Sequence, residues 1–314
     1  VTAGVLAQGG GIRRRLPQLG VYAGPGASGV ANAAVFAKTV DAPVTHVLDF
    51  ASSDNWAGIT GPDWLLKPHA GGAARLEYSL PMLPVGDQYS LASCASGAYD
   101  QQRKLLATKL VAAGLADTIV RPGWEFNGDW YPWSAAGHVA SYVGCFRQIV
   151  ANMRTVAGQR FAFDWNPTLG LNAMPAELAY PGDGYVDFIG VDAYDTSPVF
   201  ASASSPDAAA RASAWHDDHH GDHGLAFWSR FAAAHHKPMA IPEWGVVHGT
   251  QRDGGGDDPA YVDHMFAFMT DQKNHVAYEQ YFDAGSAAAE HRLGPGTIFP
   301  LSQAEFRKVV RSFS

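Results

Sequence analysis

The sequence is poor in cysteine, in charged residues and in long apolar runs. Among its 314 residues are only 2 Cys, and charged residues make up 17%. The two cysteines, Cys94 and Cys145, allow at most one internal disulfide, which excludes a small disulfide-stapled scaffold and leaves open whether they pair. No run reaches the roughly 18 apolar residues that a membrane-spanning helix needs, so no membrane insertion is expected.

Positive charge is also scarce. The net charge is −8, with 22 Lys and Arg against 30 Asp and Glu. A nucleic-acid partner demands a basic surface, so this balance argues against one, and it gives no reason for adsorption to an anionic membrane. The segment Tyr22-Ala23-Gly24-Pro25-Gly26 lacks the GxGxxG spacing of a dinucleotide site. No cofactor is expected, and the sequence does not indicate an oligomeric state.

Apolar residues are abundant at 47%, and they form eight short runs that alternate with helical patterns. Nearly continuous apolar runs are typical of strands buried on both faces of a parallel sheet. The predicted strands span residues 19–22, 45–50, 76–83, 118–124, 161–166, 186–192, 238–243 and 276–282. The predicted helices span residues 28–39, 97–115, 139–156, 224–236, 259–272 and 303–313.

This alternation predicts either a doubly wound open sheet or a (β/α)8 TIM barrel. Eight units and the missing phosphate turn favour the barrel, which commonly needs about 250 residues or more. We expect a flexible lead-in over residues 1–18 and a single barrel domain over residues 19–314. Long connections at 194–224 and 246–258 follow strands, which places them on the C-terminal face where barrels hold their active sites.

Two glutamates end strands that lie on opposite sides of such a barrel. Glu125 ends the fourth strand and Glu243 ends the seventh. Carboxylates at these positions can face each other across the mouth, as glycoside hydrolysis requires of its acid and its nucleophile. A separation of roughly 5–5.5 Å would indicate retention of configuration, and one of roughly 6.5–9.5 Å inversion.

Three segments resemble glycoside hydrolase family 26, which includes β-mannanases. They are Arg121-Pro122-Gly123-Trp124-Glu125 with the aromatic cluster after it, the stretch 180–192, and Lys237-Pro238 through Glu243. The resemblance implies a retaining endo-acting glycosidase, with Glu125 as acid/base and Glu243 as nucleophile, acting on a mannan-type or related polysaccharide. Trp124 stands where the family commonly has a His, so another β-linked glycan or a furanosidic glycan is an alternative substrate.

Further residues are assigned from their positions. Arg121 could keep the Glu243 carboxylate ionised through charge-assisted hydrogen bonds, and Tyr194 matches the family's tyrosine that donates to the nucleophile. Indole and phenol rings stack on the C–H faces of sugars. The predicted substrate contacts are Trp56, Trp124, Asn127, Trp130, Trp133, Trp165, Asn166, Asp192, Trp244 and Tyr281.

The stretch 216–223 holds four His and three Asp. Side chains of these types could ligate a metal, but no helical partner spacing accompanies them. We therefore expect no metal site here, but a polar loop or one that contacts the distal part of the substrate. Two other function classes stay open: a carbohydrate-binding barrel without catalysis, and a metal-dependent hydrolase or deacetylase built on this loop. A secreted or cell-envelope location is slightly favoured over a cytoplasmic one.

Overall fold

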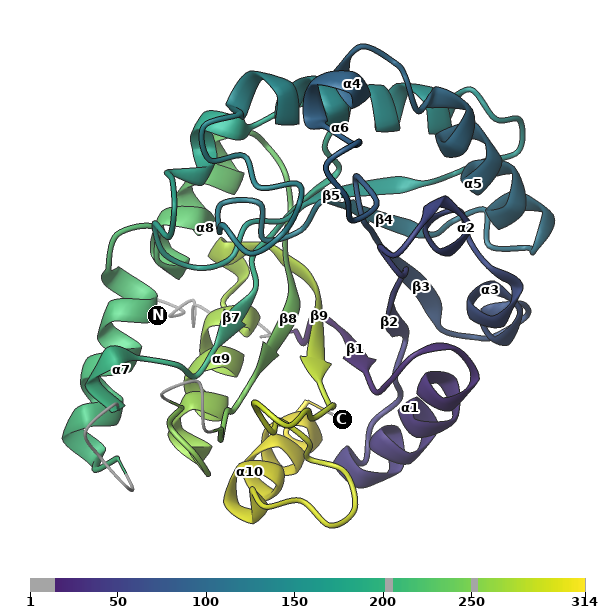
Figure 1. Cartoon of the computed structure of the whole chain (residues 1–314). Helices are drawn as coiled ribbons and strands as arrows, with labels where there is room; N and C mark the ends of the chain where they lie inside the picture. The colour runs from purple at the N-terminus through teal and green to yellow at the C-terminus, as the bar shows by residue number, and fades with distance from the viewer. Residues whose placement is uncertain (1–14, 201–205, 250–253, 314) are drawn as a thin grey trace, which may run out of the picture.

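A computed structural model describes residues 15–200, 206–249 and 254–313 of the chain as a closed barrel of parallel strands ringed by helices (Figure 1). The barrel strands are β1 (Gln18–Tyr22), β2 (His46–Phe50), β3 (Arg75–Leu80), β4 (Ile119–Pro122), β5 (Ala162–Trp165), β6 (Phe188–Gly190), β8 (Met239–Gly245) and β9 (Val276–Phe282). The two-residue strand β7 (Ala193–Tyr194) continues the line of β6 and pairs with the end of β8.

The sheet closes because β6 pairs with β8 and β9 pairs with β1. Every pairing between named strands is parallel. All strands therefore end at the same rim, which brings residues far apart in sequence to one mouth. The predicted (β/α)8 barrel is confirmed.

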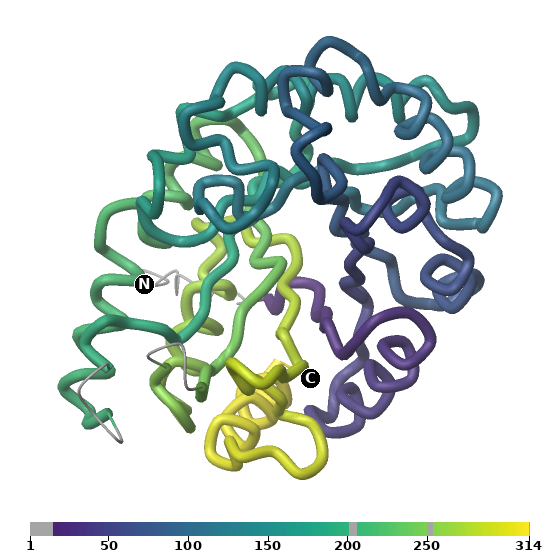
Figure 2. Tube along the Cα trace, in the orientation of Figure 1, coloured from purple at the N-terminus to yellow at the C-terminus, as the bar shows by residue number. Residues whose placement is uncertain are grey.

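Helices cover the outside of the barrel and bury one apolar side each. They are α1 (Gly26–Val40), α2 (Trp56–Ile59), α3 (Asp63–His69), α4 (Leu91–Ala95), α5 (Asp100–Ala112), α6 (Val139–Arg154), α7 (Ala208–His220), α8 (Leu225–Ala234), α9 (Pro259–Thr270) and α10 (Pro300–Arg311). The stripe predicted for 139–156 is the buried face of α6, with Phe146, Ile149 and Met153 fully enclosed. In Figures 1 and 2, α1 and α10 lie side by side, so the two ends of the barrel sequence meet.

The connection predicted at 194–224 is wrong in part, because it contains the helix α7. The Asp207 side chain caps its first turn by accepting from the Ala210 N–H at 2.8 Å. Alanine has the highest helix propensity, and the run after Asp207 is rich in it. His216, His219 and His220 therefore lie on a helix and not in a polar loop.

Two predicted segments fall partly outside the described residues. The lead-in predicted over 1–18 lies outside the described residues up to residue 14, and β1 already begins at Gln18. The connection 246–258 falls partly outside them, at 250–253.

Cys94 and Cys145 form a disulfide that joins α4 to α6. Within the described ranges, no helix has the length and apolarity to cross a membrane.

Candidate active site

Glu243 lies near the C-terminal end of β8 and is held from two sides. The Arg121 Nη2 donates to its Oε1 at 2.5 Å, and the Tyr194 hydroxyl donates to its Oε2 at 2.7 Å. The residue is only 6% exposed. Both donors thus fix the rotation of a carboxylate that is almost fully withdrawn from bulk solvent.

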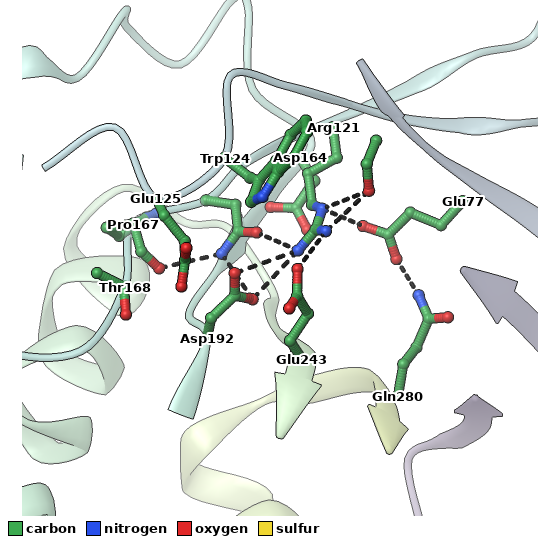
Figure 3. A network of polar contacts seen from close by, with 12 residues as sticks. Glu77, Arg121, Trp124, Glu125, Asp164, Pro167, Thr168, Asp192, Glu243 and Gln280 are labelled. Carbon is green, nitrogen blue, oxygen red and sulfur yellow. Dashed lines mark hydrogen bonds and ion pairs between the residues drawn. The ribbon is translucent and has the colours of Figure 1, made fainter. Parts of the chain in front are cut away.

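Arg121 is the centre of the polar network (Figure 3). From β4 it also donates to the Asn166 Oδ1 at 2.7 Å, to the Asp192 carboxylate at 3.2 Å and to the Ser79 Oγ at 2.8 Å. Burial disfavours its cation, but the neighbouring carboxylates, Glu243 foremost, outweigh that cost and raise the Arg121 pKa. The guanidinium is therefore a permanent positive charge at the floor of the mouth.

Glu125 lies in a tight turn just beyond β4. Gly123 and Glu125 both adopt left-handed backbone angles, with φ of 58° and 51°. The Glu125 N–H donates to the Asn166 carbonyl at 2.8 Å, which ties this turn to the end of β5. Its Oε2 accepts from the Trp130 indole N–H at 3.0 Å. A left-handed non-glycine residue is uncommon, and its side chain here is aimed by the turn and not by a strand.

A cleft of about 720 Å³ starts at Glu125 and Tyr194 and runs toward the end of α7. Trp130 and Leu169 contribute apolar surface to it, and Trp130 is 49% exposed. Burial, reinforced by Glu243, raises the pKa of Asp192 well above its usual range. At the far end, burial and the neighbouring Asp217 raise the pKa of Asp218 to about 8. The cleft is large enough for several sugar rings and has polar groups along one wall.

The structure brings six of the predicted supporting or substrate-contacting residues to the mouth around Glu125 and Glu243. They are Arg121, Tyr194, Asn166, Asp192, Trp124 and Trp130. The Trp124 ring lies beside the Arg121 guanidinium, whose Cζ is 5.5 Å from the ring centroid (Figure 3). The Trp124 indole N–H donates to the Tyr131 hydroxyl at 3.2 Å.

Three predicted substrate contacts point away from the mouth and need correction. Trp165 packs against Phe231 of α8, and Trp244 stacks on Phe306 of α10. Tyr281 is fully buried, and its hydroxyl donates to the His291 carbonyl at 2.8 Å. Successive side chains of a strand alternate between the barrel interior and the helix layer, so neighbours of inward polar residues point outward. These three residues are core.

Three other predicted substrate contacts instead contact neighbouring parts of the protein. Asn127 is buried, and its amide bonds both the Thr168 N–H and the Thr168 carbonyl at 2.9 Å, so it fixes the loop after β5. Trp133 is 1% exposed and donates to the Trp124 carbonyl. Trp56, the first residue of α2, packs 4.9 Å from Tyr99, which directly precedes α5, in a separate aromatic group. None of the three lines the cleft.

Several site residues were missed by sequence reasoning. Ser79 bonds Arg121 from β3, and Thr168 and Thr196 line the cleft. Ser79 had a usable signal, because polar residues alternate with apolar ones in Arg75-Leu76-Glu77-Tyr78-Ser79-Leu80. The loop residues had none, because their position depends on how the connections fold back over the rim.

No group of three or more His, Cys, Asp or Glu in the described ranges is placed to hold a metal ion. The imidazoles of α7 instead contact one another, with 5.1 Å between the tilted His216 and His220 rings and an edge-to-face contact between His219 and His220. Fold and site together define a (β/α)8 barrel with a buried, arginine-held carboxylate and a second carboxylate at its mouth.

Comparison with known proteins agrees with this class. The model of "Glycosyl hydrolase family 26" matches residues 92–207, which include Arg121, Glu125 and Tyr194 but not Glu243. Endoglucanase H of Acetivibrio thermocellus is 31% identical over 116 residues, which is 34% of this chain and 13% of that protein. Mannan endo-1,4-beta-mannosidase of Bifidobacterium adolescentis is 31% identical over 129 residues, 38% of this chain and 12% of that protein.

Among solved structures, the catalytic domain of the GH26 endo-beta-1,4-mannanase of a Bacillus species superposes with a TM-score of 0.66 at 18% identity. It covers 94% of this chain and 86% of that chain. At this identity the likeness establishes the fold alone. The chain thus has the (β/α)8 barrel fold, and over residues 92–207 it is similar to glycoside hydrolase family 26.

Proposed function

We propose that this barrel is a retaining glycoside hydrolase that cleaves a polysaccharide internally. The carrying observation is the environment of Glu243, whose two oxygens accept from Arg121 at 2.5 Å and from Tyr194 at 2.7 Å. This arrangement orients an ionised carboxylate for attack and leaves Glu125 across the mouth as the proton donor. A binding module would need neither the buried carboxylate nor its two donors.

The proposed reaction runs in two displacements. A Glu243 oxygen attacks the anomeric carbon while Glu125 gives its proton to the departing oxygen, so a glycosyl ester forms as the glycosidic bond breaks. Glu125, now a carboxylate, takes a proton from water, and the water oxygen displaces Glu243. The product keeps the configuration of the substrate, and both glutamates return to their starting states.

For the substrate we propose a β-linked glycan of the mannan or glucan type. The names of the two relatives, an endoglucanase and a mannan endo-1,4-beta-mannosidase, support this range. The chain covers only 13% and 12% of those proteins, so their activities serve here as candidates to be tested. Trp124 is 5% exposed and lies beside Arg121. Its indole is larger than the His that the family commonly has at this position, so it leaves less room for a sugar hydroxyl there. For this reason the proposal includes glucans as well as mannans.

The direct test is a panel of β-1,4-mannan, β-1,4-glucan, xylan and arabinan, each incubated with purified protein and assayed for reducing ends. We expect cleavage of at least one, and loss of cleavage by at least about 10⁴-fold in Glu243→Gln, because a catalytic nucleophile has no substitute. Azide should restore turnover to Glu125→Ala with unchanged anomeric configuration.

Two outcomes would support the rival classes. Binding to a glycan without cleavage, unchanged in Glu243→Gln, would favour a carbohydrate-binding barrel. Loss of activity in EDTA, restored by a divalent cation, would favour a metal-dependent hydrolase.

We propose further that the protein works in an oxidising compartment, such as the cell envelope or the exterior. The Cys94–Cys145 bond supports this, because such bonds persist where thiols are not kept reduced. Mass spectrometry of protein isolated from the producing cells should find this pair blocked to alkylation, whereas two alkylated thiols would place the protein in a reducing compartment.

A further inference from the structure

Below Arg121 the barrel interior holds a polar cluster that the proposed reaction does not use. Glu77 of β3 and Asp164 of β5 lie there with Tyr278 and Gln280 of β9. Each of the four is at most 1% exposed. Gln280 donates to the Glu77 Oε2, and Glu77 in turn lies 3.8 Å from the Arg121 Nε (Figure 3).

The charges in this interior do not balance. The four acids are Glu77, Asp164, Asp192 and Glu243, and Arg121 is the one cation in ion-pair contact with any of them among the described residues. Its two Nη atoms already serve Glu243 at 2.5 Å and Asp192 at 3.2 Å. An unpaired buried carboxylate is costly, so Glu77 and Asp164 cannot both be ionised at neutral pH.

Tyr278 shows where the extra proton lies. Its hydroxyl is 2.6 Å from the Asp164 Oδ2 and 3.2 Å from the Glu77 Oε1. Burial, with Asp164 and Glu77 next, raises the Tyr278 pKa well above its usual range, so the phenol keeps its single hydrogen. One hydrogen can be donated to only one of the two acids. Gln280 serves only the Glu77 Oε2, so one of the two acids must carry a proton, or either the Glu77 Oε1 or the Asp164 Oδ2 would lie without a hydrogen donor.

Among the described residues, no cation other than Arg121 lies in ion-pair contact with the pair. The His46 ring is stacked 5.3 Å from the Tyr278 ring, and burial followed by the Arg75 charge lowers its pKa to about 4, so it stays neutral. At Gly190, an added Cβ would lie 2.6 Å from both Asp164 oxygens, so the backbone closes the space on that side. Burial raises the pKa of both Glu77 and Asp164, and for Glu77 the Asp164 charge adds to it.

We propose that Glu77 and Asp164 share one proton in the active protein, and that this proton makes Glu77 a positioning residue for Glu243 by leaving the Arg121 charge to the nucleophile. When the proton is lost in alkali, a further buried carboxylate competes for the same guanidinium. Arg121 is then drawn toward Glu77, and Glu243 loses its orientation. The inference about Glu243 rests on the proposed function, but the shared proton does not.

The first test needs no substrate. Infrared difference spectra of wild type minus Glu77→Gln, recorded against pH, isolate the carbonyl band of the shared carboxylic acid and its midpoint. Coupling between two sites is reciprocal, so Glu243→Gln should free Arg121 for the pair and lower that midpoint by about one pH unit. Asp164→Asn should remove the same band if Glu77→Gln folds poorly. An absent band, or a midpoint that Glu243→Gln leaves in place, would overturn the proposal.

The second test uses 2,4-dinitrophenyl β-mannobioside and β-cellobioside, whose leaving group needs no acid from Glu125. The wild-type kcat/KM should fall about tenfold across the midpoint of the pair, while Glu77→Gln stays flat because its amide has no proton to lose. Glu279→Gln is the matched control, since Glu279 is an equally buried acid that faces Trp244 outside the barrel.

Glu279→Gln should keep the wild-type activity profile. A Glu77→Gln profile that overlays the wild type would contradict the positioning role. Failure to cleave either glycoside would count against the proposed function, and the infrared shift in Glu243→Gln would still decide whether the pair and Glu243 are coupled.

Discussion

Tyr194 and Arg121 hold different oxygens of Glu243, and the loss of either donor can be measured separately. Tyr194→Phe removes only the 2.7 Å hydrogen bond, because the ring still packs 5.1 Å from His291. A hydrogen bond to a charged group contributes about 1.5–3 kcal/mol. We therefore expect kcat to fall by roughly 10- to 100-fold, together with a lower urea unfolding midpoint.

Tyr78→Phe is the control for that variant. The Tyr78 hydroxyl is buried and donates to the Ile59 carbonyl at 2.8 Å on the outer side of the barrel. It should lower the unfolding midpoint and leave kcat unchanged. If Tyr194→Phe kept the wild-type kcat, the hydroxyl would have no part in orienting Glu243.

Trp130 combines a hydrogen bond to Glu125 with an exposed ring on the cleft. Trp130→Ala removes both, so we expect kcat/KM on a cleaved polysaccharide to fall by about 10-fold or more, with a rise in KM from the lost stacking surface. Trp64→Ala removes an indole of similar exposure, 53% against 49%, that packs on Gly26 and does not line the cleft. Equal losses in the two variants would show that Trp130 has no special role.

At the scale of elements, the turn after β4 aims Glu125. An added Cβ at Gly123 would lie 2.8 Å from the Met82 sulfur, at a φ of 58° that side chains resist. Gly123→Ala should therefore destabilise the fold by about 1–2 kcal/mol and also lower kcat, because the turn and Glu125 must shift. Urea unfolding and initial rates on the same preparation measure both effects.

Gly114→Ala is the control for Gly123→Ala, because it introduces a side chain at a left-handed backbone angle without a steric clash. Gly114 has a φ of 79°, but an added Cβ there would meet nothing within 4 Å. It should cost about 1 kcal/mol of stability and leave kcat unchanged. A Gly123→Ala enzyme with full activity would mean that the turn does not control Glu125.

The elements also show what the sequence could predict. Continuous apolar runs located all eight barrel strands, and the 3.6-residue stripe located α6, because both patterns depend only on local burial. Trp165, Trp244 and Tyr281 were assigned to the site because they lie near strand ends. A shift of one residue along a strand reverses the face, and Asn166 and Glu243, one position away, occupy the mouth.

Other features depended on contacts that no local pattern carries. The helix α7 was missed because its His and Asp residues concealed an alanine-rich, Asp-capped start. Glu77 was not recognised because its partners come from β4, β5 and β9, and only closure of the barrel brings them together. The disulfide likewise depends on how α4 lies across α6.

For the whole molecule, buried acids make stability depend on pH. Burial raises the pKa of Glu279 to about 8, against 4.5 for an unperturbed group. Its protonated form is therefore favoured by folding, and this contribution is complete below pH 4.5 and is lost as the pH rises through about 8.

Glu279→Gln should consequently flatten the decline of stability between pH 5 and pH 9, measured as the urea midpoint at each pH. Glu305→Gln, which removes a surface acid paired with Lys308 at 2.8 Å, should leave the wild-type slope. A slope that Glu279→Gln does not change would mean that this carboxyl is ionised in the folded protein.

Direct attack of Glu243 on the anomeric carbon fixes the configuration of the product. Proton NMR of the first product released from a β-linked glycan of the panel, recorded before mutarotation, measures the configuration of the new reducing end. Two displacements through Glu243 and Glu125 predict the β-anomer as the first product. The α-anomer as first product would contradict the account, because it would require a single displacement by water with no ester on Glu243.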